Sequence, residues 1–168
     1  MKAEEIIEYF GMRPLAEEGG FYVETYRAKE KIAKAGLDGR YSGDRYHSTA
    51  ILYLLAARTF SAMHRVKSDE VFHFYMGDAV TMLQLRADGA SEVITLGQDI
   101  LNGERVQAVV PNGNWQGCFL KDGGEFALMG CTVSPGFEFA DYENGKREEL
   151  IRRYPQREEM IRKLTKEI

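Results

Sequence analysis

The sequence predicts an all-β domain, either a sandwich or a closed barrel, with a short helix before it and helices after it. Short apolar segments rich in β-branched and aromatic residues follow one another from about residue 20 to residue 143. Most of the gaps between them contain glycine, aspartate or asparagine, as in Asn112-Gly113-Asn114. Strands do not alternate with helical segments, which argues against a parallel sheet. We therefore expect a single domain over residues 1–168, with the barrel core at about 20–143.

The composition is that of an ordinary globular protein that binds neither nucleic acid nor membranes. Of the 168 residues, 44% are hydrophobic and 29% are charged, and the net charge of −4 comes without a basic stripe that could neutralise phosphates. The first eight residues contain three glutamates and no apolar core, which is not the pattern of a signal peptide. No apolar run is long enough to span a bilayer. We expect a cytoplasmic protein in which Cys118 and Cys131 are buried thiols.

The elements before the barrel follow from spacing and glycine positions. Ile6, Ile7 and Phe10 recur at helical intervals and Gly11 follows them, which predicts a helix over Ala3–Phe10. An aromatic and β-branched run at 21–26 predicts the first long strand. Residues 29–45 are polar and glycine-containing, and we interpret them as a mobile loop or an excursion before the core.

The remaining strands and the tail follow in order. Apolar segments predict strands at residues 48–55, 60–66, 70–75, 79–86, 91–96, 106–110, 115–120, 126–133 and 137–142. Residues 146–168 have helical spacing, and Pro155 divides them into two short helices. We expect this helical tail to pack on the outside of the barrel.

One segment concentrates chemically useful side chains. Glu70, Phe72 and Phe74 share one face of an extended strand, because side chains alternate along it. A carboxylate beside two phenylalanines is costly to bury, so that face either lines a wet pocket or gives Glu70 a strong partner. His64 is the natural partner if residues 68–69 turn the chain. His73, on the opposite face, is expected at the barrel surface or an interface.

The same segment resembles the first cupin motif, which ends in a histidine, a second histidine, a glutamate and a glycine. His64, Glu70 and Gly77 fit three of these positions, and Val66 stands where the second histidine belongs. The second cupin motif matches at Pro111-Asn112-Gly113, but with Gln116 in place of its histidine.

The chain as a whole, from about residue 5 to residue 155, resembles the small single-domain cupins of family five, which have no settled function. Besides the histidine segment with Ser61, three stretches carry the match: Glu18-Gly19-Gly20-Phe21-Tyr22, Val109-Val110-Pro111 with Trp115-Gln116, and Val133-Ser134-Pro135-Gly136-Phe137-Glu138. The resemblance implies a jelly-roll barrel of the double-stranded β-helix type, and cupins commonly form homodimers through sheet edges. We therefore expect a homodimer.

Many cupins hold a divalent metal with three histidines and a glutamate, and the resemblance directs attention to the same positions here. They supply His64, Val66, Glu70 and Gln116, and a valine donates nothing. Zinc and non-haem iron usually require two or three histidines, so we expect no cofactor. His64, Glu70 and Gln116 remain as the ligands of a weak divalent-metal site, which is one alternative.

Without a metal, His64 and Glu70 form an acid–base pair. Metal-free sugar-nucleotide epimerases of the cupin superfamily use a histidine base, a carboxylate partner and a tyrosine acid. The resemblance therefore implies an epimerase or isomerase in which His64 removes a proton next to a carbonyl of a sugar-nucleotide-like or other carbonyl substrate. Tyr53 or Tyr75 would return the proton from the other side.

Further residues are candidates for contact with a small ligand. Gln116, Phe72, Phe74 and Ser61 are expected around the pocket. Arg65, with Lys67 and Arg45, offers a site for an anionic group or a solvated rim. Trp115 either stacks on a ligand or belongs to a core or interface. A barrel that binds a small polar ligand without chemistry is the alternative to an enzyme.

Overall fold

A computed structural model of the chain describes residues 1–166, and in this part of the chain the strands form two facing barrel sheets and one small hairpin sheet. The larger barrel sheet has the order β1 (Arg13–Pro14), β2 (Phe21–Arg27), β5 (Thr49–Ala56), β12 (Phe126–Ser134), β7 (Asp69–Gly77), β10 (Gln107–Val110). The smaller barrel sheet has the order β13 (Glu143–Asn144), β6 (Phe60–Arg65), β11 (Trp115–Leu120), β8 (Val80–Leu85), β9 (Ser91–Leu96). Adjacent strands in both sheets are antiparallel, which confirms the all-β prediction.

The main core lies between the inner faces of the two sheets. The register aligns Tyr53 of β5 with Met129 of β12 and then with Phe74 of β7, and all three are buried. Met82 of β8 and Cys118 of β11 belong to the same buried cluster. This packing follows from the alternation of each strand, which directs every second side chain inward.

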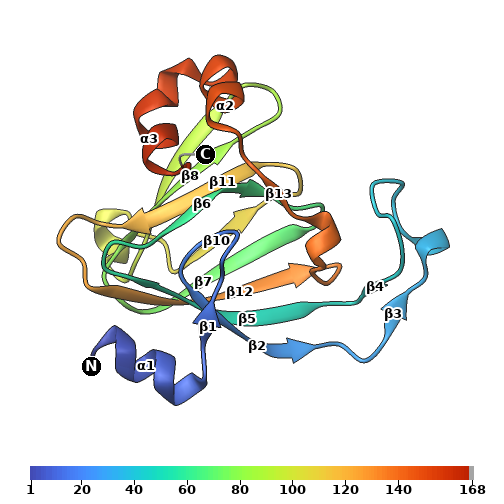
Figure 1. The fold of residues 1–168 in the computed structure, drawn as a ribbon, viewed down its shortest axis with the longest axis horizontal. Helices are drawn as coiled ribbons and strands as arrows, with labels where there is room; N and C mark the ends of the chain where they lie inside the picture. Colours follow the sequence, from blue (N-terminus) through green and yellow to red (C-terminus); the bar gives the residue numbers. More distant parts are fainter. Residues whose placement is uncertain (167–168) are drawn as a thin grey trace.

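Helix α1 (Ala3–Phe10) has the predicted bounds and covers part of the outer face of the larger sheet (Figure 1). Its buried Ile6 packs with Leu54 and Leu128, side chains of β5 and β12 that point away from the barrel core. Gly11 ends the helix in the left-handed conformation, at φ +61°, and its N–H is donated to the carbonyls of the last turn. Glycine adopts this conformation without the penalty of a Cβ atom.

The tail packs on the outer face of the smaller sheet, as expected (Figure 1). Helices α2 (Arg147–Arg153) and α3 (Glu158–Lys163) are separated at Pro155, where the sequence predicts the break. Leu150 and Ile161 are buried in one cluster with Leu83 and Trp115. Residues 167–168 of the predicted tail lie outside the described residues.

The structure differs from the prediction in two segments. The excursion at 29–45 is not entirely loop, because β3 (Lys31–Ile32) pairs with β4 (Arg45–Tyr46) in a small hairpin sheet. The strand predicted at 137–142 is wrong: a 3-10 turn, Phe139–Asp141, stands there. The alternating pattern of the segment resembles that of a strand. In the structure, however, Glu138 pairs with Arg27 and Asp141 pairs with Arg45, and these ion pairs hold the segment as a turn.

None of the helices within residues 1–166 combines the length and apolar character required to cross a bilayer.

Candidate functional site

A cavity of about 300 Å³ lies inside the barrel, against the inner face of the larger sheet. The register explains its floor, because it places Thr49 beside Val133 and Val133 beside Glu70 in a row across three strands. Cys131 of β12 and Glu18, which precedes β2, also line it. The segment 137–142, which we name the roof segment, contributes the opposite wall.

Glu70 is 6% exposed and both of its carboxylate oxygens accept hydrogen bonds from uncharged donors. Gln116 donates its amide to Oε2, and the Cys131 thiol donates to Oε1 at 3.3 Å. Burial raises the pKa of Glu70, the charge of His64 opposes this shift, and the charge of Glu18 adds to it. Glu70 therefore holds a proton more tightly than an exposed glutamate does.

His64 is 2% exposed, and a hydrogen bond with the main chain assigns the tautomer of its neutral ring. Nδ1 lies 2.7 Å from the carbonyl oxygen of Ala62, which can only accept, so we assign the hydrogen to Nδ1. Nε2 is then the ring nitrogen without a hydrogen in the neutral form, and it lies 3.7 Å from Oε2 of Glu18. Gln116 connects this histidine to Glu70, because it pairs with His64 in register and donates to Glu70.

The carboxylate partner of His64 is therefore Glu18 rather than Glu70, a pairing that the sequence did not lead us to expect. Glu18 Oε1 accepts a 2.6 Å hydrogen bond from Ser61, and its main-chain carbonyl accepts from Ala62 N. Gly19 follows with φ +112°, and a Cβ there would collide with the Phe60 carbonyl. This close approach brings Glu18 against β6, and the Glu-Gly-Gly stretch was the available signal for it.

The roof segment places aromatic side chains over the cavity. Phe137, Phe139 and Tyr142 line it, and the Tyr142 ring stacks on His64 with centroids 5.2 Å apart and planes 20° apart. Burial and the charge of Glu18 raise the pKa of Tyr142, so this phenol stays neutral near neutral pH. Its hydroxyl donates to the Asn144 side chain at 2.9 Å.

Charged and aromatic groups surround the mouth of the cavity. Arg27 donates to Glu24 and to Glu138 of the roof segment, the latter at 3.0 Å. Arg13 lies with its guanidinium 5.0 Å from the centre of the Tyr22 ring. The mouth thus offers a stacking surface and a guanidinium to any group that extends out of the cavity.

Two tyrosines proposed as acids lie away from the cavity floor. Tyr75 is 46% exposed on the outer face of β7, because alternation from Glu70 directs it outward. Tyr75 does not reach the cavity, so the prediction that it returns a proton to the substrate is wrong. Tyr53 is buried in the core and donates its hydroxyl to the Gly19 carbonyl at 2.9 Å, and burial raises its pKa.

Two residues proposed to contact a ligand lie on the outside of the smaller sheet. Trp115 is buried beneath the helical tail, and Arg65 stacks on its ring at 4.4 Å while pairing with Glu143. Their neighbours Gln116 and His64 point inward, since successive side chains of a strand alternate.

The other candidates remain inside the barrel. Phe72 and Phe74 belong to the core, and Ser61 holds Glu18. His73, by contrast, lies on the outer face of β7 beside Thr132 and Gln107, as strand alternation predicts.

The residues at the cupin metal positions do not fit a divalent ion. Val66 is buried and has no donor, and both oxygens of Glu70 are already occupied by the Gln116 amide and the Cys131 thiol. Within residues 1–166, no three His, Cys, Asp or Glu side chains are arranged to hold a metal. We assign no chemical step to a metal.

A second concave surface, of about 490 Å³, lies between α1 and the outer face of the larger sheet. Tyr9, Phe10, Met76 and Leu128 make it almost entirely apolar. The cavity inside the barrel is the better candidate site, since polar groups converge there.

Known proteins resemble this chain over nearly its whole length. The protein SO0799 from Shewanella oneidensis has 32% identity and a TM-score of 0.88, with 100% of this chain and 99% of that chain covered. A hypothetical protein from Leishmania major has 27% identity and a TM-score of 0.88, covering 99% and 100%. The uncharacterized protein YML079W from Saccharomyces cerevisiae is 29% identical over 143 residues, which are 80% of this chain and 71% of that protein.

More distant structures share the fold alone. Oxalate decarboxylase from Bacillus subtilis aligns with a TM-score of 0.53 at 14% identity, over 92% of this chain and 37% of that one. The family model described as Cupin superfamily (DUF985) matches residues 4–144. The barrel, the cavity and this match agree, and the chain belongs to the DUF985 family of the cupin superfamily.

Proposed function

We propose that this protein is a small-molecule isomerase or epimerase that moves a proton on the carbon next to a carbonyl group. Glu18 and His64 together would serve as the base, and Glu70 as the acid. The observation that supports this most is that Glu18 and Glu70 line one cavity in different environments, with a histidine beside one of them.

The two carboxylates suit opposite roles. Burial raises the pKa of Glu70, which makes it the better proton donor. Glu18 is oriented by Ser61, and a proton that it removes from a substrate has a further acceptor in His64 Nε2. His64 is nearly inaccessible, so it would act through Glu18 rather than on the substrate directly.

The size and lining of the cavity limit the substrate. A volume of about 300 Å³ is at the low end of the roughly 300–1,000 Å³ of ligand pockets. Aromatic rings of the roof segment suit the apolar face of a sugar ring, and the carboxylates suit its hydroxyl groups. A compound of about one sugar ring is therefore favoured inside, with any nucleotide part at the mouth near Arg13 and Tyr22.

Proton removal can be measured without knowing the product. The protein is incubated in D₂O with a panel of aldoses, ketoses and nucleoside-diphosphate sugars, and mass spectrometry detects deuterium bound to carbon. We expect exchange in at least one compound. In Glu18→Gln and Glu70→Gln the rate should fall about 10²–10⁴-fold, the usual contribution of a positioned acid or base.

Matched variants test whether position matters. His64→Gln should lower the exchange rate, whereas His73→Gln, on the outer face of β7, should not. Glu143→Gln removes an exposed carboxylate and should also leave the rate unchanged. Exchange that persists in both Glu18→Gln and Glu70→Gln would contradict the proposal.

A non-catalytic binding protein is the second candidate, and the burial of His64 favours it. A histidine that is 2% exposed and donates to a main-chain carbonyl is already well accommodated as a structural residue. In this case a compound of the panel raises the melting temperature through binding to the folded state, and no deuterium enters it. Deuterium exchange in the stabilising compound would exclude this alternative.

A further inference from the structure

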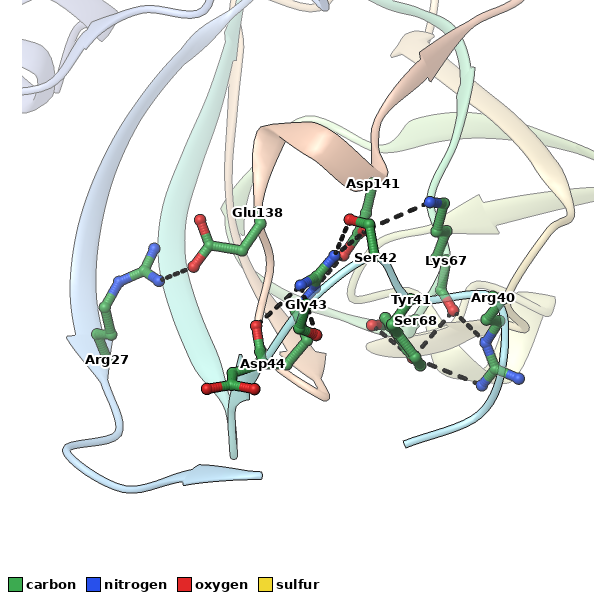
Figure 2. Close-up of polar contacts among 11 residues, drawn as sticks. Arg27, Arg40, Tyr41, Ser42, Gly43, Asp44, Lys67, Ser68, Glu138 and Asp141 are labelled. Atoms are coloured by element: carbon green, nitrogen blue, oxygen red, sulfur yellow. Dashed lines mark hydrogen bonds and ion pairs between the residues drawn. The ribbon is translucent and has the colours of Figure 1, made fainter. Parts of the chain in front are cut away.

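A buried ion pair lies beside the cavity and takes no part in the chemistry proposed above. Arg45 and Asp141 are each 4% exposed, and two guanidinium nitrogens donate to the two carboxylate oxygens at 2.6 Å. Arg45 also donates to the main-chain carbonyls of Gly43 and Asp44. Lys67 Nζ lies 3.7 Å from the same carboxylate (Figure 2).

Together with Lys67, this pair joins three separate parts of the chain. Arg45 is in β4, at the end of the excursion, Asp141 is in the roof segment, and Lys67 is in the turn between β6 and β7. The excursion has a second attachment to that turn, because buried Tyr41 donates to the Lys67 carbonyl and contacts the Ser68 hydroxyl (Figure 2). The excursion therefore braces the roof segment against the barrel.

Stability alone is a weak reason to bury these charges. Removing two ions from water costs several kcal/mol each, and apolar side chains of similar volume are often as stable or more so. A bidentate guanidinium–carboxylate pair does provide a fixed geometry that apolar contacts lack. The pair is therefore well suited to setting the position of the segment that carries Asp141.

The position of the roof segment decides what covers His64. Tyr142 follows Asp141 directly, lines the cavity and stacks on the histidine ring. The other end of the segment is held by Glu138 and Arg27, whose side chains are 40% and 30% exposed and form a weaker contact (Figure 2). Asp141 is thus the buried attachment directly before Tyr142, while the pairing of β13 with β6 holds the chain directly after it.

We propose that Arg45 and Asp141 are positioning residues, which fix the roof segment so that Tyr142 covers His64 and closes the cavity. Their effect on proton transfer rests on the proposed function, but the placement of Tyr142 over His64 does not. The placement can be measured in the absence of any substrate.

Nuclear magnetic resonance of the histidine Cε1–H groups gives this measurement. The chain has only three histidines, and the ring current of Tyr142 displaces the His64 signal. Tyr142→Leu gives the signal position of an uncovered His64. The double variant Arg45→Met with Asp141→Leu replaces the pair by apolar side chains and is expected to fold. Its His64 signal should move most of the way to the Tyr142→Leu position, while the His73 signal stays in place.

Two further variants make the test decisive. Arg45→Lys keeps the charge and loses the bidentate geometry, so the His64 signal should move part of the way. Arg105→Met with Glu92→Leu removes an exposed pair and should leave the signal unchanged. A His64 signal that stays at the wild-type position in the folded Arg45 variants would overturn the proposal. A protein without deuterium exchange but with the expected signal shifts would refute only the proposed isomerase.

Discussion

Among residues 1–166, two groups of charged side chains are buried in or beside the barrel, and they differ in their partners. In the pair Arg45–Asp141, each charge meets the opposite charge through two 2.6 Å hydrogen bonds. In the cavity, Glu70 accepts only from an amide and a thiol, and His64 Nε2 is 3.7 Å from the Glu18 carboxylate. The cavity groups therefore have no partner of opposite charge at hydrogen-bond distance, whereas each member of the Arg45–Asp141 pair does.

This difference suggests a structural role for the Arg45–Asp141 pair and a role in ligand binding for the cavity carboxylates. A buried charge is costly unless it is paired, so a fully saturated pair is explained by the geometry that it fixes. Carboxylates that are buried with neutral donors and face a cavity have no such explanation within the fold. Perturbed groups of this kind are typical of sites that bind or transform a ligand.

The largest expected effect on the free energy of unfolding comes from breaking the buried Arg45–Asp141 pair. Asp141→Asn keeps the shape of the side chain but leaves the Arg45 charge buried without its counter-ion. The free energy of unfolding should fall by about 3–5 kcal/mol, measured by urea denaturation. Glu143→Gln, at an exposed pair with Arg65, should cost at most about 1 kcal/mol. Equal losses in the two variants would show that burial does not distinguish these pairs.

The sequence predicted the elements of the barrel but not these pairs. Helical spacing, strand alternation and turn residues are local patterns, so α1 and the barrel strands were predictable. The break at Pro155 between the two tail helices was predictable for the same reason. Arg45 and Asp141 are 96 residues apart, and no local pattern relates them. The same holds for Ser61 and Glu18, which are 43 residues apart.

Within the site, strand alternation carried more information than proximity in sequence. Alternation places Tyr75 on the face opposite Glu70, and Trp115 opposite Gln116, which is where the structure has them. Proximity in sequence to Glu70 and Gln116 therefore does not bring either side chain to the cavity.

The next effect concerns the orientation of Glu18. Ser61→Ala removes the 2.6 Å hydrogen bond to this carboxylate. Hydrogen bonds to charged groups contribute about 1.5–3 kcal/mol, and the free energy of unfolding should fall by about that amount. Ser134→Ala removes a hydroxyl group that donates to the His47 carbonyl at the exposed end of β12 and should cost less. An unchanged stability of Ser61→Ala would mean that Glu18 is not held by this contact.

A smaller effect tests the remaining tyrosine candidate. Tyr53→Phe removes one hydrogen bond, from the hydroxyl to the Gly19 carbonyl, and should cost about 0.5–1.5 kcal/mol. Deuterium exchange should persist at the wild-type rate, because the structure gives this hydroxyl a structural partner. A variant of normal stability that has lost exchange would restore Tyr53 as an acid.

The smallest expected effect is a dependence on pH at Glu70. Its pKa in the folded chain is raised above the ordinary value of 4.5, so between these values the folded state binds the proton more tightly than the unfolded state. The stability that this proton confers is complete below about 4.5 and is lost as the pH rises through the raised pKa. The charge of His64 and the donors Gln116 and Cys131 favour the ionised form and so limit the shift.

The variant Glu70→Gln cannot ionise. Its free energy of unfolding relative to wild type, measured by urea denaturation, should therefore increase from acidic to neutral pH. A relative stability that stays constant with pH, or decreases, would show that burial does not favour the protonated form of Glu70. The cavity carboxylates would then resemble the saturated pair in being fully compensated by their surroundings.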